Sequence, residues 1–317
     1  MRAVTIAQDG VSVEERPDPV PGAGDLLVRV RAAGLNAADL MQVRGLYPAP
    51  PGVPADIPGL ELAGEVVGVG EGVTRFRPGD RVMSLVGGGA QAELATVGEQ
   101  VAMPVPPALG WVAAGGFPEA FTTAHDALVT QCRLRSGERL LVTGAAGGVG
   151  TAAVQIGAAV GAEVVASVRP PGLKPMVAGL GAVAVDPSEA EGYGPFDVII
   201  ELVGAVNFPA NVRCLASGGR IAVIGVGAGS RIELDLLALM RRRARIMGST
   251  LRNRSPEEKA LAARRVEADL LPLVAAARLR VVVGETFDLE EAAAAYGRFQ
   301  AGGKLGKIVL SVGRNGP

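Results

Sequence analysis

The sequence has few of the residues that build metal and disulfide sites. Its 317 residues include two cysteines, Cys132 and Cys214, and one histidine, His125. Two cysteines are too few for a disulfide framework or a cysteine-built zinc site, which favours a reducing, cytoplasmic location. A catalytic zinc takes three protein ligands from Cys, His or carboxylate residues, so we expect no metal.

Aromatic residues are also scarce, and the positive and negative charges nearly balance. Phe, Trp and Tyr make up 3% of the chain, and its formal net charge is −1. The basic run at 241–245, with Arg252 and Arg254 nearby, lacks the stacking aromatics that single-stranded nucleic acids use, so we interpret it as a solvated helix end. No apolar run reaches membrane-spanning length, and residues 1–10 lack the apolar core of a signal peptide. Neither nucleic acid nor membrane is expected as a partner.

Glycine, in contrast, is abundant, and it is concentrated in a turn inside a β-α-β pattern at 139–169. The apolar strand, the turn, the periodic helix and the second strand are expected at 140–143, 144–150, 151–160 and 163–167. A dinucleotide pyrophosphate needs to approach bare backbone N–H groups at the start of such a helix. The pattern therefore predicts a dinucleotide site, with an ordinary strand–helix turn as the alternative. Its predicted contacts are Ala146, Gly147, Gly148 and Val149.

The end of the second strand indicates which dinucleotide binds. A free ribose 2′-hydroxyl usually meets an Asp or Glu at this point. The chain instead offers Ser167 and Arg169, with no acid between Glu163 and Asp186. A guanidinium without a competing carboxylate suits a 2′-phosphate, so NADPH is favoured over NADH, and Lys174 would add a second positive charge. The alternative is that Arg169 is only solvated.

Outside this pattern the chain changes character twice. Up to about residue 105, short β-like runs are separated by Gly and Pro, which suggests a small barrel-like β domain. From about 116 to 254, strand candidates alternate with helical segments, as in a parallel, doubly wound sheet. The strands expected in these two regions cover 25–31, 62–69, 81–85 and 93–97, then 198–202, 220–224 and 245–249.

The tail has a clear helix start, because Ser255 is a capping residue and Pro256 suits the first helical turn. After this helix we expect a strand near 281–283, a helix over 290–300 and a last strand at 306–311.

Several motifs in a fixed order give the sequence a specific resemblance. They are GLNAADLM (34–41), GLELAGEV (59–66), GDRV (79–82), the AAGGVG turn (145–150) and GKIVL (306–310). Over essentially its full length the chain resembles zinc-independent medium-chain dehydrogenase/reductases of the quinone oxidoreductase (zeta-crystallin-like) family. Segments 41–52, 117–123 and 249–255 are most similar to the branch of the tumour-suppressor-inducible quinone oxidoreductase.

This resemblance implies an α/β fold with two domains. A GroES-like β-barrel catalytic domain would comprise 1–115 and 255–317, because the tail returns to complete it. A Rossmann domain with a doubly wound parallel sheet would occupy 116–254. The resemblance also implies a homodimer in which the edge strand at 245–249 pairs with its twofold mate, since an exposed edge is usually covered.

The resemblance bears on the metal too. In zinc-dependent relatives a Cys stands where Asn36 stands and a His where Leu60 stands before Glu61, and the four-cysteine structural lobe of those relatives is absent. We expect His125 in a helix that links the domains, at the helix surface or between the domains rather than in a catalytic role.

Without metal or a catalytic histidine, the implied chemistry is direct hydride transfer from NADPH to an electron-poor carbon. Quinones and α,β-unsaturated carbonyls suit this transfer, because the negative charge delocalises onto oxygen and needs only a hydrogen-bond donor. The sequence thus predicts an NADPH:quinone oxidoreductase. An enoyl-thioester reductase and a non-catalytic NADPH-binding protein are the alternatives.

The resemblance also suggests individual roles. Tyr47 is the best donor candidate, because it lies in the Pro-rich loop that the family places over the nicotinamide; an aromatic lid that only packs is the alternative. Asn36 would hold Tyr47 or the cofactor amide, or would cap the following helix. Thr123 matches a family residue that approaches the nicotinamide, or is a cap at a helix start. Gly225 and Val226, at a strand's carboxyl end, would flank the nicotinamide with backbone groups.

Overall fold

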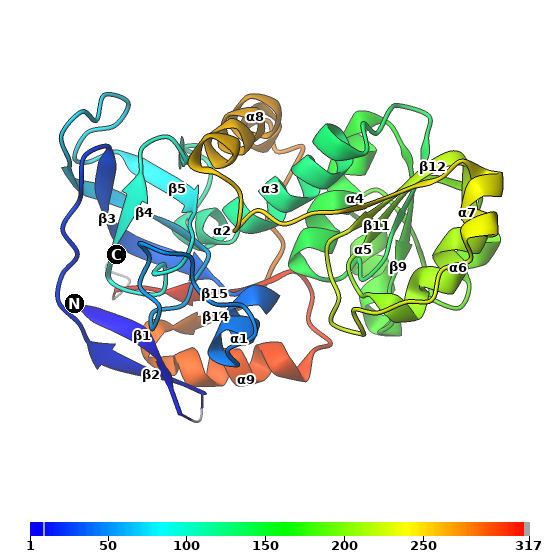
Figure 1. Ribbon diagram of the computed structural model, residues 1–317. Coiled ribbons are helices and arrows are strands. Elements are labelled where there is room, and N and C mark those ends of the chain that lie inside the picture. The colour runs from blue at the N-terminus through cyan, green and yellow to red at the C-terminus, as the bar shows by residue number, and fades with distance from the viewer. Residues whose placement is uncertain (9, 314–317) are drawn as a thin grey trace. The chain divides into compact units, whose positions relative to one another are not determined.

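The computed structural model describes residues 1–8 and 10–313 (Figure 1). The chain forms two compact units, Met1–Thr122 with Arg252–Pro317, and Thr123–Leu251. We call the first the β-rich unit and the second the α/β unit. The C-terminal segment belongs to the first because strand β15 (Lys307–Ser311) pairs with strand β3 (Asp25–Gly34). No helix among the described residues combines the length and the apolar character needed to cross a membrane.

A curled, mostly antiparallel sheet is the frame of the β-rich unit. Strand β3 carries β4 along one edge, while its other edge pairs with β6 at residues 25–29 and with β15 at residues 32–34. A strand shared in this way is typical of a partly open barrel. The other strands of this sheet are β4 (Glu61–Val69), β5 (Arg81–Leu85), β6 (Leu94–Gly98), β7 (Ala102–Pro104) and β14 (Val283–Asp288), and β1 (Arg2–Ala7) and β2 (Gly10–Glu15) form a separate hairpin.

Alternating burial explains where these strands lie. In β3, Leu26 and Val28 are fully buried whereas Arg29 is exposed, the period of two expected when one face of a strand packs on the core. The strands predicted in the first hundred residues are confirmed. The strand expected near 281–283 was placed too early. Strand β14 begins at Val283 and alternates in burial along its pairing with β15, so the valine run before it was a misleading signal.

The helices of the β-rich unit begin where side chains can cap them. Ser255 Oγ accepts from the Glu258 N–H at 3.3 Å and Glu258 Oε2 accepts from the Ser255 N–H at 3.0 Å, which confirms the predicted start of helix α8 (Pro256–Ala275). Helix α9 (Ala292–Ala301) packs beside β2 and β14 (Figure 1). The shorter helices are α1 (Ala37–Val43), α2 (Trp111–Gly115) and α3 (Pro118–His125), the last of which crosses the boundary into the α/β unit.

The α/β unit is a doubly wound parallel sheet, as predicted. Its strands in spatial order are β10 (Val183–Val185), β9 (Glu163–Ser167), β8 (Arg139–Val142), β11 (Phe196–Glu201), β12 (Leu215–Val223) and β13 (Arg245–Gly248). Leu141, Ile199 and Ile221 fill its core. The chain order reverses between β8 and β11, and in open α/β sheets ligands bind at the carboxyl ends of the strands beside such a reversal.

Helix α4 (Gly148–Val160) starts three residues before the predicted Thr151. Gly147 adopts the extended conformation of an N-cap (φ −75°, ψ 173°), so the helix begins inside the glycine turn. The α/β unit also has the π-helix η1 (Asp126–Gln131), the α-helices α5 (Lys174–Ala178), α6 (Phe208–Arg213) and α7 (Leu236–Arg242), and short 3-10 turns between them.

Candidate active site

The glycine turn is closed by backbone contacts that leave no room for a side chain at Gly150. The Gly147 N–H donates to Gly144 O at 3.1 Å, and the Thr151 N–H donates to Gly147 O at 2.9 Å. A Cβ on Gly150 would lie 2.6 Å from Gly144 O, a distance that real Cβ atoms do not adopt. The sequence therefore needs glycine at this position to let helix α4 approach the strand end.

The turn presents unpaired backbone donors to a ligand. The N–H groups of Gly148, Val149 and Gly150 precede the Thr151 N–H, the first donor to a carbonyl of this helix, and are available to an anion at the positive end of the helix. The turn is also tied to the next strand, because the Ala145 N–H donates to Ser167 O at 3.1 Å. These residues fit the pyrophosphate of a dinucleotide.

The side chains predicted to determine whether NADPH or NADH binds lie at and after the end of strand β9. Ser167 is the last residue of β9 and is buried, whereas the Arg169 side chain is exposed. Among the described residues, Arg169 has no ion-pair partner. Lys174 is less free, because its Nζ lies 3.8 Å from Glu189 Oε2. Of these three side chains, Arg169 is therefore the most accessible to a phosphate group.

A buried carboxylate that the sequence analysis missed organises the neighbouring loop. Glu201 ends strand β11 and is fully buried. Its Oε1 accepts from the Val203 and Gly204 N–H groups, both at 2.7 Å, and its Oε2 accepts from Asn211 Nδ2 at 2.6 Å. The backbone O of Glu201 also accepts from the Gly225 N–H at 3.0 Å. Glu201 thus fixes the carboxyl end of the sheet next to β8.

The other residues that the sequence analysis discussed near the cofactor differ in their secondary structure and burial. Gly225 and Val226 follow the carboxyl end of β12, as expected, and Val226 is 43% exposed. Thr123 is the sixth residue of α3, so the interpretation as a cap at a helix start was wrong. His125 ends α3 and is buried, so the predicted helix is confirmed and a position on the helix surface was wrong.

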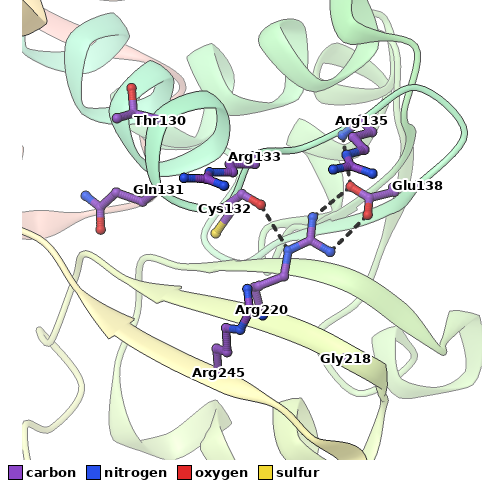
Figure 2. A pocket seen from close by; sticks show the side chains of 9 residues that line it. All are labelled: Thr130, Gln131, Cys132, Arg133, Arg135, Glu138, Gly218, Arg220 and Arg245. Carbon is purple, nitrogen blue, oxygen red and sulfur yellow. Dashed lines mark hydrogen bonds and ion pairs between the residues drawn. The ribbon is translucent and has the colours of Figure 1, made fainter.

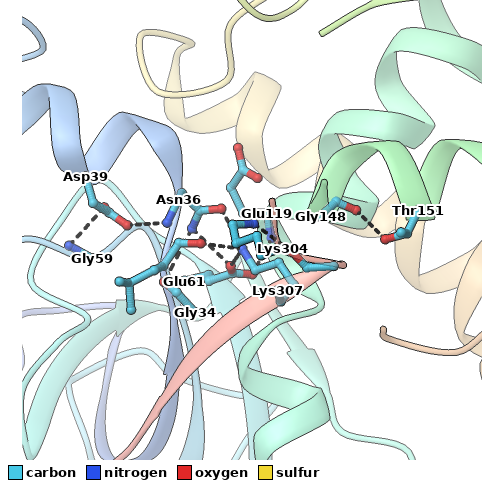
Figure 3. A network of polar contacts seen from close by, with 12 residues as sticks. Gly34, Asn36, Asp39, Gly59, Glu61, Glu119, Gly148, Thr151, Lys304 and Lys307 are labelled. Atoms are coloured by element: carbon cyan, nitrogen blue, oxygen red, sulfur yellow. Dashed lines mark hydrogen bonds and ion pairs between the residues drawn. The ribbon is translucent and has the colours of Figure 1, made fainter. Parts of the chain in front are cut away.

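In the β-rich unit, an ion pair is buried beside Asn36 (Figure 3). The Lys307 ammonium contacts Glu61 Oε1, and the two side chains are 4% and 0% exposed. Lys307 Nζ also donates to Asn36 Oδ1 at 2.6 Å and to Leu35 O at 3.0 Å, while Asn36 Nδ2 donates to Glu61 Oε1 at 3.0 Å. Glu61 Oε2 accepts from the Glu119 N–H at 2.8 Å. We call Asn36, Glu61 and Lys307 the ionic cluster.

The surrounding chain is shaped to hold this cluster. A Cβ on Gly34 would lie 2.2 Å from Glu61 Oε1, so only glycine leaves room for the carboxylate. Asn36 stands at the N-cap of α1, and its backbone N–H donates to Asp39 Oδ2 at 2.8 Å. The Asn36 side chain is therefore directed into the cluster and the helix start is capped by Asp39.

Zinc does not fit this donor set. Leu60 has no donor atom, the Asn36 amide is already bonded to Glu61 and Lys307, and Glu61 is paired with an ammonium. A fixed positive charge at this place repels a second cation. In the part of the chain that the structure describes, no three His, Cys, Asp or Glu side chains gather as a metal site.

Asp39 is a second buried carboxylate in this region. It accepts from the Asn36 N–H and, through Oδ1, from the Gly59 N–H at 3.2 Å. Burial raises the pKa of Asp39 to about 7, against the opposing effects of the Asn36 hydrogen bond and the Lys307 charge. The protonation of Asp39 therefore changes near neutral pH.

Tyr47 is half-buried and is held by an arginine that the sequence analysis misjudged. Arg252 Nη1 donates to Tyr47 O at 2.8 Å, and its guanidinium carbon lies 4.8 Å from the centroid of the Tyr47 ring. Arg252 also donates to Gly87 O at 2.9 Å and to Gln42 Oε1 at 2.6 Å. Arg252 is buried, so its interpretation as part of a solvated basic run was wrong.

The charged residues missed by sequence reasoning share one signal. Glu61 and Lys307 each begin an apolar strand, and Glu201 ends one. A single charge at the end of an apolar run indicates a buried, partnered group, because an unpaired buried charge is costly.

Two family descriptions match the chain, an alcohol dehydrogenase GroES-like domain over residues 22–133 and a zinc-binding dehydrogenase domain over residues 180–310. The quinone oxidoreductase of Rattus norvegicus is 32% identical over 92% of this chain and 90% of that protein. Acryloyl-coenzyme A reductase of Metallosphaera sedula is 32% identical over 98% of this chain and 100% of that protein. Polyketide synthase GfsB of Streptomyces halstedii is 33% identical over 91% of this chain, which spans 5% of that protein's length.

Solved structures share the fold across almost the whole chain. Mycobacterial Rv1454c complexed with NADPH has a TM-score of 0.88 at 26% identity and covers 98% of this chain and 99% of its own. A NAD-dependent alcohol dehydrogenase has a TM-score of 0.87 at 29% identity and covers 99% of this chain and 100% of its own. Nicotinamide dinucleotides of both kinds are thus named for proteins of this fold.

Proposed function

The chain is an oxidoreductase of the medium-chain dehydrogenase/reductase family, and on that premise we propose that it transfers hydride from NADPH to quinones or α,β-unsaturated carbonyls without a metal ion. The similarity to the rat quinone oxidoreductase supports this choice of acceptor. The glycine turn and the exposed Arg169 support NADPH as the donor.

The ionic cluster is the observation that carries the proposal. An ammonium has three donors, and Lys307 directs its donors at Leu35 O, Asn36 Oδ1 and Glu61. Lys307 is therefore not available to polarise a substrate carbonyl, and the residues around it do not fit zinc. A quinone or an enone delocalises the added negative charge by itself, so its reduction needs neither a metal ion nor the Lys307 ammonium.

We assign the cofactor to residues of the turn and of the strand ends. They are Thr123, Ala146, Gly147, Gly148, Val149, Ser167, Arg169, Lys174, Gly225 and Val226. When bound, NADPH supplies the hydride. The protein's part is to bind its pyrophosphate through the α4 amides and its 2′-phosphate through Arg169, which distinguishes NADPH from NADH.

Tyr47 is proposed as the donor to the substrate oxygen. Arg252 fixes both the backbone and the ring of Tyr47, so the phenol is positioned before substrate arrives. A donor held in place in advance stabilises developing negative charge without reorganisation. Asn36 is a positioning residue in this proposal, since its amide holds Lys307 and Glu61 rather than substrate.

An enoyl-thioester reductase is the second candidate. The similarity to acryloyl-coenzyme A reductase and to a segment of polyketide synthase GfsB favours it. An enoyl thioester is itself an α,β-unsaturated carbonyl, so the same hydride transfer would serve. The two candidates differ in acceptor and not in mechanism.

Steady-state oxidation of NADPH with three acceptors tests the proposal. We expect turnover with a small quinone and with a simple enone at rates that exceed the rate with crotonyl-coenzyme A, and no loss of activity after exhaustive chelation. Preference for the thioester would establish the second candidate. Tight NADPH binding without turnover of any acceptor would indicate a non-catalytic NADPH-binding protein.

A further inference from the structure

A strongly cationic pocket opens on the α/β unit at the amino-end edge of its sheet (Figure 2). Its volume is about 490 Å³. Glu138 directly precedes β8, and Arg245 is the first residue of β13, so both lie at the amino ends of their strands. The glycine turn leaves the opposite end of β8, about 13 Å away at 3.3 Å per residue. The pocket is therefore separate from the proposed cofactor site.

The charges in the lining do not balance. Four arginines, Arg133, Arg135, Arg220 and Arg245, face one carboxylate, Glu138. Arg220 pairs with both oxygens of that carboxylate, with Nη1 at 2.9 Å from Oε1 and Nη2 at 2.8 Å from Oε2, and Oε2 also accepts from the Arg135 backbone N–H at 2.9 Å. The guanidinium groups of Arg133, Arg135 and Arg245 have no ion-pair partner in the described part of the chain. Three positive charges thus remain uncompensated.

The sheet places two of these arginines against each other. Arg220 and Arg245 are register partners on the parallel strands β12 and β13. Like charges at paired positions of neighbouring strands destabilise the sheet. Glu138 compensates the charge of Arg220, whereas Arg245 has no ion-pair partner in the described part of the chain. The neighbouring Cys132 supplies no thiolate to Arg245, because burial raises the pKa of Cys132 to about 11 and keeps its thiol neutral.

The lining also limits what kind of anion fits. Guanidinium groups match the oxygen atoms of phosphate and carboxylate in a bidentate geometry. Thr130 and Gln131 add a hydroxyl and an amide to the wall, but no aromatic side chain lines the pocket to stack a base. A cavity of this volume accommodates a small molecule. The observations favour a small, multiply charged anion.

We propose that this pocket binds a phosphate-bearing small molecule, with Arg133, Arg135 and Arg245 as its ligands on the wall formed by the Arg220–Glu138 pair. Two or three uncompensated guanidinium groups match the charge of a phosphate monoester or a pyrophosphate. The site does not depend on the redox reaction proposed above.

Titration calorimetry with pyrophosphate tests this site. The protein is first saturated with NADPH, so that the glycine turn is occupied, and ionic strength is held constant. We expect saturable binding of one pyrophosphate per chain, weaker binding of inorganic phosphate, and weaker binding still of succinate, which carries two carboxylates. Absence of saturable binding, or preference for succinate, would overturn the proposal.

The backbone offers a matched pair of variants. Arg133 and Arg243 both adopt left-handed conformations (φ 51° and 49°), so glycine suits either position and each variant is expected to fold. Arg243 bonds to Ser217 Oγ at 2.9 Å and does not line the pocket. We expect Arg133→Gly to weaken pyrophosphate binding about tenfold or more, and Arg243→Gly to change it less than about twofold.

A second pocket variant, Arg245→Gln, removes charge without touching the left-handed turn. We expect it to weaken pyrophosphate binding by a factor similar to that for Arg133→Gly. Equal weakening by Arg243→Gly, or parent-like binding in both pocket variants, would show that only the overall charge of the unit matters and would refute the site.

Discussion

Arg252 holds the backbone and the ring of Tyr47. Replacing Tyr47 by phenylalanine therefore removes the phenol hydroxyl and leaves the ring in its position. If the hydroxyl donates to substrate, Tyr47→Phe should lower kcat for a quinone about tenfold and leave NADPH affinity nearly intact. An enone should lose more, because its product charge is less delocalised. Steady-state rates on one quinone and one enone measure this.

Tyr47→Ala supplies the control, because it removes the ring as well as the hydroxyl. If Tyr47 acts only by packing, Phe will behave like Tyr on both substrates while Ala weakens both.

Arg169 is the residue on which the preference for NADPH depends. A charge-assisted contact to phosphate contributes on the order of 1.5–3 kcal/mol, so Arg169→Asp should raise the Kd for NADPH about tenfold or more and affect NADH little. Arg231→Asp makes the same charge change at another exposed arginine of the α/β unit and should have a small effect. Fluorescence titration of the parent and both variants with NADPH and with NADH gives the six Kd values. Equal affinities of the parent for NADH and NADPH would contradict the prediction.

Asp39 should give the stability a dependence on pH. Its pKa is about 7 when folded and ordinarily 3.8, so the folded state binds the proton more tightly than the unfolded state. The resulting stabilisation is fully present below pH 3.8 and is lost as the pH rises through about 7, a change of up to roughly 4 kcal/mol.

Denaturant unfolding at about pH 5 and about pH 8 measures this effect. Asp39→Asn cannot ionise, and its single side-chain oxygen can accept from the Asn36 N–H or from the Gly59 N–H but not from both in the present geometry. We expect the variant to be more stable than the parent at the higher pH and to lose most of the pH dependence. A parent and variant with the same pH dependence would show that Asp39 does not titrate in this range.

Among the elements, the junction of β8, the glycine turn and α4 is the most constrained. A Cβ on Gly150 would meet both Gly144 O and Ala145 Cα at 2.6 Å, whereas one on Gly147 would lie 3.5 Å from Gly144 O. Gly150→Ala must therefore displace the start of α4 and its amides, and we expect the Kd for NADPH to rise about tenfold or more. Gly147→Ala should weaken binding less. Isothermal titration of the two variants distinguishes them, and equal effects would mean that packing of the turn is not what positions the amides.

Elements defined by local pattern could be predicted from the sequence. The strand at 25–31, the cap at Ser255 and the glycine turn each depend on residues a few positions apart, and each was predicted. The ionic cluster was not, because Lys307 and Asn36 are 271 positions apart and neither has a local signature of the other. Arg252 and Tyr47 are 205 positions apart, and for the same reason the local sequence predicts a solvated arginine.

At the scale of the whole molecule, the α/β unit has an open side. Strand β13 ends the sheet order, and nearby helix α7 exposes Leu236 and Met240 by 64% and 70%. The family resemblance and this edge lead us to predict a homodimer through β13. Light scattering at micromolar concentration should give twice the chain mass.

Lysine substitutions test which surface is involved. Leu236→Lys with Met240→Lys should shift the protein towards monomer, whereas Val20→Lys, at a still more exposed apolar residue of the β-rich unit, should not. A monomeric parent protein would remove the prediction.

The late position of Lys307 in the chain also affects the order in which the two units can fold during synthesis. Glu61 is synthesised early and is buried in the finished fold, but Lys307, its ion-pair partner among the described residues, arrives with β15, near the other end of the chain. Domains tend to fold as they emerge from the ribosome. The α/β unit is contiguous from Thr123 to Leu251 and has all its strands before β15 exists. In a nascent chain the α/β unit would thus fold first. The β-rich unit would remain incomplete, with the negative charge of Glu61 uncompensated, until translation has passed Lys307.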